Sequence, residues 1–338
     1  MKSVTPHKVI TASNFLDEIA QKRIMIIGDV MVDSYLWGHV NRISPEAPVP
    51  IVDVVKREER LGGAGNVVLN IQAMGATPII CTVIGTDAKA DTFLQLLKQS
   101  EISTQTVVKS PERCTTTKFR IIGNNAQMLR VDEEHKHELS AVEEQKLLGI
   151  ITTTLQTQVV DAIIFQDYDK GVITKTLIKQ VVKLANEKGI PTCVDPKKQH
   201  FMDYHDVTLI KPNLKELYEG LNLTFNTKNL DSIEKAMVLL QKTLAAKIVF
   251  TTLSELGVAI YDTPHFFHHP AHIRQIADVS GAGDTVISVA SLCLALGLNT
   301  QAIARISNLA GGLVCESVGV VPVDKSRLLD EIISHHCL

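Results

Sequence analysis

Short, nearly continuous apolar runs alternate along the chain with longer amphipathic segments. The runs RIMIIGD, PIICTVIG and DAIIFQD carry few polar residues, as expected of parallel strands that are covered on both faces. Segments with helical spacing, such as TKTLIKQVVKLANEKG, stand between such runs. This βαβ rhythm predicts an α/β fold built on a parallel sheet.

Two segments break this rhythm, at residues 33–60 and 112–131. In both, polar and apolar residues alternate without an intervening helix, which predicts strands with one wet face. We expect the two segments to pair into a small antiparallel sheet that stands off the main body as a lid. Its other face must be covered, either by the ligand or by another subunit.

From about Gly281 onward the pattern is helical, in GDTVISVASLCLALG, TQAIARISNLAGGLVCESVG and KSRLLDEIISHHC. At 338 residues and 45% hydrophobic, the chain can bury a large core as one α/β domain or as two smaller ones. Its 34 basic and 37 acidic residues are interspersed, which favours neither nucleic acid nor an anionic membrane as partner. A small molecule is the expected ligand.

Six cysteines show no C-x-x-C pair and no regular spacing, so we expect most of them to be buried thiols in a reducing compartment. The first 23 residues lack the apolar core of a secretory signal. No apolar run reaches the roughly 18 to 20 residues of a membrane span. A soluble, cytoplasmic protein is expected.

The stretch Asp278–Thr285, DVSGAGDT, precedes the apolar run VISVASLCLALG. Its glycines allow a tight turn with uncovered backbone N–H groups, and the following helix adds its positive end, which predicts a phosphate site. A carboxylate beside bound phosphate is unfavourable unless it acts on the reaction. Asp284 is therefore predicted to take a proton from a hydroxyl that attacks the phosphorus. From this motif alone, an acid that merely complements the helix dipole is the alternative.

A second glycine cluster, RLGGAGNVVLNIQAMG, also opens a helix, with Gly62, Gly63 and Gly65 ahead of it and Asn66 in its first turn. A simple cap would explain Asn66 but not the glycines, which favours close approach of a ligand to the backbone. Upstream, GDVMVDSY places Asp29 and Asp33 at the carboxyl end of the first strand, where open α/β sheets bind ligands. Asp33 could accept hydrogen bonds from a polyol, and turn formation is the alternative.

The segment IKPNLKE puts Asn213 and Glu216 three residues apart at a helix start. They could hold Mg²⁺ through waters, or they could simply cap the helix. The four histidines of HFFHHPAH could suggest a metal site. Pro270 prevents His268 and His272 from sharing one helical face, so we interpret the segment as an exposed strand and loop. Neither a Walker loop nor a G-x-G-x-x-G turn occurs in the chain.

These segments together resemble the ribokinase-like (PfkB) carbohydrate kinases. The two signatures of that family are a Gly-Gly motif, here Gly62 and Gly63, and a D-x-x-G-A-G-D motif, here Asp278 to Asp284. RISPEAPVPIVDV, QDYDKGVIT, VDPKKQHFMDY and TLIKPNLKEL are more closely similar to the kinase half of bacterial ADP-heptose synthesis enzymes. The second half of the bifunctional relatives carries H-x-G-H, which is absent here, so the stand-alone kinase is expected.

The resemblance implies a three-layer αβα sandwich, formed as a single domain over residues 1–338, with a small β-sheet lid. It also implies a role for each matching residue. The catalytic set would be Asp284 as base, with the amides of Gly281, Ala282 and Gly283 as anion hole. The sugar phosphate would meet Asp33, Gly62, Gly63, Asn66, Lys170, Arg130 and Arg42. The nucleotide would meet Lys211, Asn213, Glu216, Thr252, Ser254, Gly257 and Asn308, with Asn213 and Glu216 also serving Mg²⁺ through water.

Three positions depart from the pattern of the family. Ser280 stands where threonine is frequent, Ser254 where glycine is frequent, and Asp169 where the heptose enzymes have glycine. Asp169 would add an unfavourable charge beside Lys170 if its side chain pointed inward.

The resemblance therefore implies an ATP- and Mg²⁺-dependent kinase for the anomeric hydroxyl of D-glycero-D-manno-heptose 7-phosphate, in the route to ADP-heptose and lipopolysaccharide. A monovalent cation and a homodimer joined through the lid strands belong to the same expectation. The alternatives are a kinase for another phosphosugar such as fructose 6-phosphate, a non-catalytic sugar or nucleotide sensor, and a nicotinamide-dependent reductase. The missing dinucleotide turn speaks against the reductase.

Overall fold

The computed structural model describes residues 9–224, 229–272 and 274–338. A nine-stranded sheet runs through its body in the order β13-β12-β11-β10-β9-β8-β1-β4-β5, and all neighbours pair in parallel except β11 with β12 and β12 with β13. The strands are β1 (Arg23–Gly28), β4 (Thr77–Ile84), β5 (Val107–Lys109), β8 (Ala162–Gln166), β9 (Thr192–Asp195), β10 (Leu209–Ile210), β11 (Ile248–Thr252), β12 (Val258–Asp262) and β13 (His265–His269).

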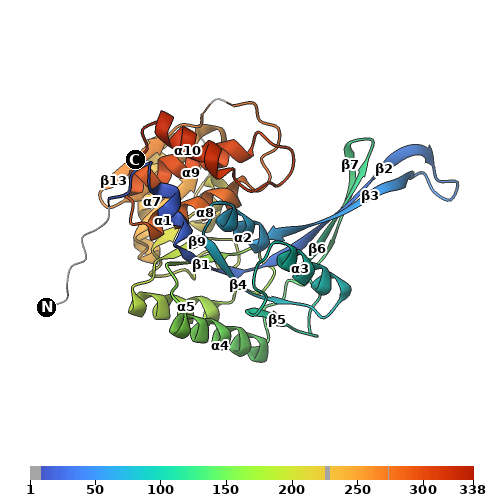
Figure 1. Cartoon of the computed structure of the whole chain (residues 1–338), viewed down its shortest axis with the longest axis horizontal. Helices are drawn as coiled ribbons and strands as arrows, with labels where there is room; N and C mark the ends of the chain where they lie inside the picture. Colours follow the sequence, from blue (N-terminus) through green and yellow to red (C-terminus); the bar gives the residue numbers. More distant parts are fainter. Residues whose placement is uncertain (1–8, 225–228, 273) are drawn as a thin grey trace.

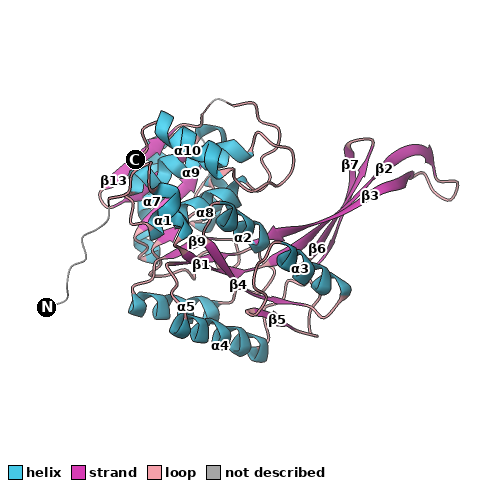
Figure 2. Ribbon diagram, viewed as in Figure 1, coloured by secondary structure: helices cyan, strands magenta, loops and turns pink. Residues whose placement is uncertain are grey.

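Helices cover both faces of this sheet (Figures 1 and 2). One core joins the sheet to α1 (Phe15–Ala20), α2 (Ala64–Ala73), α3 (Ala88–Gln99), α8 (Ala282–Ala295), α9 (Thr300–Val314) and α10 (Lys325–Ser334). The other joins it to α4 (Ala141–Thr157), α5 (Lys175–Lys188), α6 (Leu214–Gly220) and α7 (Leu230–Leu244). In β1, Ile24 and Ile26 enter the first core while Met25 and Ile27 enter the second, which is why the strand is apolar throughout. The predicted three-layer α/β sandwich is confirmed.

A separate four-stranded sheet extends from one end of the body (Figure 1). Its strands are β2 (Val30–Ile43), β3 (Pro50–Gly63), β6 (Thr117–Gly123) and β7 (Ala126–Glu133), in the order β3-β2-β6-β7. The pairing of two distant segments into a lid is confirmed, although residues 112–116 precede β6. The prediction of a wholly antiparallel lid is wrong, because β2 and β6 pair in parallel. Alternation fixes which face a side chain occupies but not the direction of the partner strand.

Several local features follow the sequence closely. Ser140 and Glu143 cap α4 reciprocally, and Gly189 ends α5 in the left-handed conformation. The histidine-rich segment forms the edge strand β13, and five of the six cysteines are buried, both as expected. Among the described residues, no helix combines the length and apolarity needed to cross a bilayer. Of the N-terminal stretch considered for a signal, residues 1–8 lie outside the described residues.

Candidate active site

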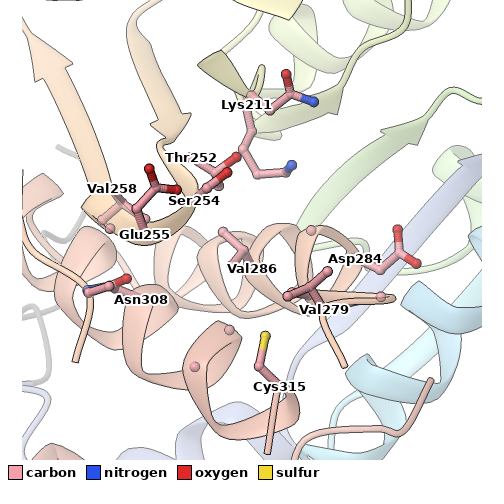
Figure 3. A pocket seen from close by; sticks show the side chains of 18 of the residues that line it. Lys211, Thr252, Ser254, Glu255, Val258, Val279, Asp284, Val286, Asn308 and Cys315 are labelled. Carbon is pink, nitrogen blue, oxygen red and sulfur yellow. The ribbon is translucent and has the colours of Figure 1, made fainter. Parts of the chain in front are cut away.

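The candidate site is a cavity of about 810 Å³ at the carboxyl ends of the parallel strands. All eleven residues predicted for catalysis or nucleotide binding line it, although they come from segments that are far apart in the chain. Figure 3 shows Asp284 at one end of the cavity, with Ser254 and Asn308 toward the other. The cavity does not include the seven residues predicted to bind the sugar phosphate; these lie on the lid, at the start of α2 and in the loop after β8.

The DVSGAGDT stretch forms a tight turn that opens α8. Gly281 is the N-cap residue with φ of +80°, and it offers no side chain to cap the helix. The backbone N–H of Ala282 donates to the Val279 carbonyl at 3.3 Å, whereas within the described residues the N–H groups of Gly281 and Gly283 have no partner. Uncapped N–H groups at a helix start are the arrangement that binds anions.

Asp278 holds this turn in place from outside the cavity. Its carboxylate accepts the backbone N–H of Ser280 at 2.9 Å and that of Gly319 at 3.0 Å. Burial alone would raise the pKa of Asp278, but these hydrogen bonds bring it below its usual value, so the carboxylate stays ionised.

Asp284 lies in the first turn of α8 and is 7% exposed. Its Oδ1 accepts hydrogen bonds from the Tyr168 hydroxyl at 2.6 Å and from Gln166 Nε2 at 3.1 Å, and its Oδ2 accepts one from Asn66 Nδ2 at 2.7 Å. Burial raises the pKa of Asp284 to about 6, against the lowering effect of the Tyr168 and Asn66 hydrogen bonds. A carboxylate with this pKa is ionised at neutral pH and basic enough to accept a proton.

Two lysines line the cavity near Asp284, of which Lys211 is buried and Lys197 is partly buried. Lys211 Nζ lies 3.1 Å from Asp195 Oδ1, and it would lie 3.7 Å from a Cβ placed on Gly283, close to the start of α8. Lys197 pairs with Glu216 and stands 5.8 Å from the centre of the Tyr168 ring. Burial would lower the pKa of Lys197, but the charges of Asp195 and Glu216 raise it above its usual value. The wall therefore presents two ammonium groups to an anionic ligand.

Asn213 and Glu216 form a reciprocal cap on α6. Asn213 Oδ1 accepts the Glu216 N–H at 2.8 Å, and Glu216 Oε2 accepts the Asn213 N–H at 2.9 Å. The capping alternative is therefore realised. No group of three His, Cys, Asp or Glu side chains in the described part of the chain could hold a metal. The oxygens of Asn213 and Glu216 fit a Mg²⁺ ion that keeps its waters and arrives on nucleotide phosphates, not an all-protein cage.

The far end of the cavity is formed by the loops after β11 and β13 and by α9. Gly257 has φ of +89°, and a Cβ there would lie 2.1 Å from the His269 carbonyl oxygen. Asn308 on α9 donates to the Pro270 carbonyl at 2.9 Å, and Arg274 pairs with Glu316 at 2.7 Å. These contacts hold Pro270 against α9 and Arg274 against the segment that follows α9, and the apolar Ile276 also lines the cavity.

The paired glycines of the first signature face protein and not open space. A Cβ on Gly62 would lie 2.5 Å from Asp33 Oδ2, and one on Gly63 would lie 2.5 Å from the Asp29 carbonyl oxygen. Asp33 lies within β2, not in a turn, and pairs with Arg120 of β6. Gly65, which the sequence placed ahead of the helix, is its second residue. The missing side chains of these glycines therefore allow strand β2 to pack close to them, in addition to any room they leave for a ligand.

The three basic residues predicted to bind the distal phosphate do not lie together in the structure. Lys170 pairs with Glu134 at 2.8 Å, and Arg130 pairs with Asp132 at 2.9 Å. Arg42 lies nine positions beyond Asp33 on β2, which is roughly 30 Å of strand. Arg130 stands beside Arg120 and Tyr35 in the strand register, so it lies seven positions short of Arg42 along the lid and is remote from it within one chain.

Asp169 does not intrude on Lys170. Its Oδ1 accepts the Gln199 N–H at 3.2 Å, which ties the side chain to the neighbouring loop.

Several residues that sequence reasoning missed belong to this region. They are Gln166, Tyr168, Asp195, Lys197 and, on the lid, Lys118 and Arg120. Gln166 and Asp195 are the last residues of β8 and β9, so the rule that ligands bind at the carboxyl ends of parallel strands could have found them. Lys118 stands opposite Asp33 and Asp132 in the strand register, and no ion-pair partner is found for it among the described residues. No local signal distinguishes Lys118 from any other strand lysine.

Comparison with known proteins places this geometry in context. A family model described as pfkB family carbohydrate kinase matches residues 21–326. The bifunctional protein HldE of Methylobacillus flagellatus is 40% identical over 309 residues, which cover 91% of this chain and 63% of that protein. HldE of Helicobacter pylori is 37% identical over 298 residues, which cover 88% of this chain and 64% of that protein. The chain thus spans less than two thirds of the length of these relatives.

Solved structures agree on the fold. Phosphofructokinase-2 from Escherichia coli in complex with potassium has a TM-score of 0.76 at 18% identity, covering 93% of this chain and 99% of that one. Ribokinase from Arabidopsis thaliana complexed with ribose and ATP has a TM-score of 0.70 at 16% identity, covering 91% and 99%. The sandwich with a small second sheet is common to these kinases and to this chain.

Proposed function

This chain belongs to the pfkB family of carbohydrate kinases, and we propose that it transfers the γ-phosphoryl group of ATP to the anomeric hydroxyl of D-glycero-D-manno-heptose 7-phosphate. The product would be the 1,7-bisphosphate, on the route to ADP-heptose and the lipopolysaccharide inner core. The observation that carries the proposal is the identity of about 40% to HldE proteins across nine tenths of this chain. We place this activity in one catalytic domain, in the reducing cytoplasm that the free cysteines suggest.

In the proposed reaction the acceptor hydroxyl gives its proton to Asp284 as its oxygen forms a bond to the γ-phosphorus. The bond from that phosphorus to the bridging oxygen breaks, and ADP leaves with the electron pair. The free N–H groups of Gly281 and Gly283 and the Lys211 ammonium would stabilise charge on the transferring group. Closure of the lid would exclude water, which would otherwise compete as acceptor.

The nucleotide would lie along the cavity from α8 toward Thr252, Ser254, Gly257 and Asn308, with its base near Ala271, His272 and Ile276. Asn213 and Glu216 would hold Mg²⁺ through water, and the ion would neutralise phosphate charge. The sugar phosphate would meet Asp33 and the paired glycines, with its distal phosphate near Lys170 and Arg130. A monovalent cation is a further part of the proposal.

A panel of sugar acceptors tests the substrate. ADP release would be measured with heptose 7-phosphate, fructose 6-phosphate and the unphosphorylated sugars, with and without K⁺, and ³¹P NMR would locate the new phosphate. We expect kcat/KM for heptose 7-phosphate to exceed that for the unphosphorylated sugars by about 100-fold or more, because a site built for a phosphate is left with unpaired charges by a sugar that lacks it. It should also exceed that for fructose 6-phosphate. A higher value for fructose 6-phosphate would establish the other phosphosugar kinase, and no ATP use with any sugar would favour the sensor.

The lid also suggests a homodimer. Phe119 and Ile121 on β6 stand opposite Val131 and Leu129 on β7, so the four share one face of the lid. Leu129 is 54% exposed and Val131 is 46% exposed. An exposed apolar face on a protruding sheet is a site for association, and a second copy of the same lid supplies a matching surface.

Sedimentation at micromolar concentration tests this association. We expect the parent protein to sediment at twice its chain mass of 37.1 kDa and Leu129→Asp to sediment as the single chain, because a buried carboxylate opposes pairing. Val142→Asp is the matched control, since Val142 is 75% exposed on α4 and away from the lid. A parent protein that sediments only as single chains would exclude the dimer.

A further inference from the structure

The two oxygens of the Asp284 carboxylate have unequal surroundings. Each oxygen of an ionised carboxylate offers about two lone-pair positions. Oδ1 already accepts two hydrogen bonds, from the Tyr168 hydroxyl at 2.6 Å and from Gln166 Nε2 at 3.1 Å. Oδ2 accepts a single one, from Asn66 Nδ2 at 2.7 Å. Oδ1 is therefore saturated, and Oδ2 keeps one position open.

The donors on Oδ1 cannot reverse their roles. The Gln166 amide nitrogen also donates to Asp195 Oδ2 at 3.2 Å, so a flipped amide would turn its oxygen toward two carboxylates. Burial raises the pKa of Tyr168 well above its usual value, and the neighbouring carboxylates raise it further, so the phenol keeps its proton. Tyr168 and Gln166 thus donate to Asp284 in every relevant ionisation state.

The donor on Oδ2 is fixed by a chain that starts at a backbone group. The Val323 N–H donates to Asn70 Oδ1 at 3.1 Å, which turns Asn70 Nδ2 toward Asn66 Oδ1 at 3.4 Å. Asn66 is then oriented with its Nδ2 toward Asp284. A backbone N–H has one direction, so this chain sets the amide orientation of both asparagines. Asn66 supplies one hydrogen bond to Oδ2 and no more.

We propose that Asp284 takes the proton of the sugar's acceptor hydroxyl on Oδ2 alone. Tyr168 and Gln166 are positioning residues, because their hydrogen bonds saturate Oδ1 and leave only Oδ2 to receive the proton. The inference rests on the proposed kinase function. In the proton transfer, the sugar O–H bond breaks and an Oδ2–H bond forms, while Oδ1 remains the carbonyl oxygen of the resulting carboxylic acid. The acceptor hydroxyl must then approach beside Asn66. Both hydrogen bonds on Oδ1 survive the transfer, so the site needs no rearrangement during the reaction.

Tyr168→Phe tests the proposal, because it removes the hydroxyl and keeps the ring beside Lys197. In the parent protein, kcat/KM should fall below pH about 6 as Asp284 becomes protonated. A hydrogen bond to the charged form lowers a pKa, so its loss should move this acidic limb upward by about one pH unit. The plateau above the limb should fall on the order of tenfold, because Oδ1 now competes for the proton.

Tyr204→Phe is the matched control. The Tyr204 hydroxyl donates to buried Asp167 Oδ2 at 2.9 Å, the same kind of bond outside the cavity. Both variants lose stability by losing a buried hydrogen bond, but only Tyr168→Phe should move the acidic limb. A limb that stays in place in Tyr168→Phe, or that moves equally in both variants, overturns the proposal.

Infrared difference spectra between low and neutral pH give a readout that needs no sugar. The carboxyl band of Asp284 is identified by its loss in Asp284→Asn. With the proton on Oδ2, the carbonyl oxygen is Oδ1 and accepts two hydrogen bonds, so Tyr168→Phe should raise the carbonyl stretching frequency. A band that Tyr168→Phe leaves unchanged would place the proton on Oδ1. This measurement stands even if no sugar is phosphorylated, whereas a silent Tyr168→Phe beside an inactive Asp284→Asn would reject only the positioning role.

Discussion

Replacing Asp284 with asparagine should abolish turnover while leaving the binding of ATP and sugar phosphate nearly intact. The amide has the size of the carboxyl group but cannot accept the acceptor proton. General-base catalysis contributes about 10²- to 10⁴-fold in rate, so kcat should fall by about that factor. Isothermal titration of each substrate, beside steady-state rates, measures the two effects separately.

A control variant and a limit on the residual rate make this prediction decisive. Asp167→Asn removes another buried carboxylate, one whose pKa burial and the charge of Asp29 raise to about 7, and it should keep turnover within about tenfold of the parent. Turnover by Asp284→Asn above about a tenth of the parent rate would show that Asp284 is not the base.

The contribution of Asp284 to the free energy of unfolding should decrease as the pH rises from about 4 to about 6. The pKa of Asp284 is raised in the folded protein to about 6, above the ordinary value of about 3.9. The folded state therefore binds the proton more tightly, and the free energy of unfolding falls as the pH rises between these two values. Asp284→Asn should remove this pH dependence, and thermal unfolding of both proteins between about pH 4 and pH 7.5 measures it. The amide is not expected to raise stability, because its Nδ2 would face either Asn66 Nδ2 or the donors on Oδ1.

Replacing Gly63 with alanine should cause a large loss of stability. Gly63 has φ of +58° and ψ of −131°, a combination open essentially to glycine alone. A Cβ there would lie 2.5 Å from the Asp29 carbonyl oxygen, which accepts the first N–H of α2, from Ala64, at 2.9 Å. Neither backbone group can move without shifting α2.

We expect Gly63→Ala to lower the free energy of unfolding by about 3 kcal/mol or more, and the melting temperature by about 4 °C at this chain length. Turnover should fall too, because α2 carries Asn66 to Asp284. Gly189→Ala is the matched control: Gly189 also has a left-handed φ, of +69°, but a Cβ there would meet nothing within 4 Å. It should cost about 1 kcal/mol and leave turnover unchanged, and equal losses in the two variants would refute the steric explanation.

The sequence by itself determined the layered fold and one half of the candidate site. Continuous apolar strands can only be covered on both faces, and glycines before an apolar helix can only leave that helix without a side-chain cap, so both features are local. The turn at Gly281 and the cap at Asn213 follow from such signals, whereas Lys211 and Asn308 were expected in the cavity only from the family resemblance. The family resemblance added the expectation that these separate motifs come together in one site.

Only the tertiary structure decided which side chains surround Asp284. Asn66, Gln166 and Tyr168 lie 218, 118 and 116 positions from it in the chain, and their contacts depend on how the sheet is ordered. The parallel pairing of β2 with β6 was undetermined for the same reason, because the alternation of a strand specifies its faces and not its neighbour. Hydrogen bonds between distant segments have no periodicity in the sequence, and in this chain they distinguish the two oxygens of a single carboxylate.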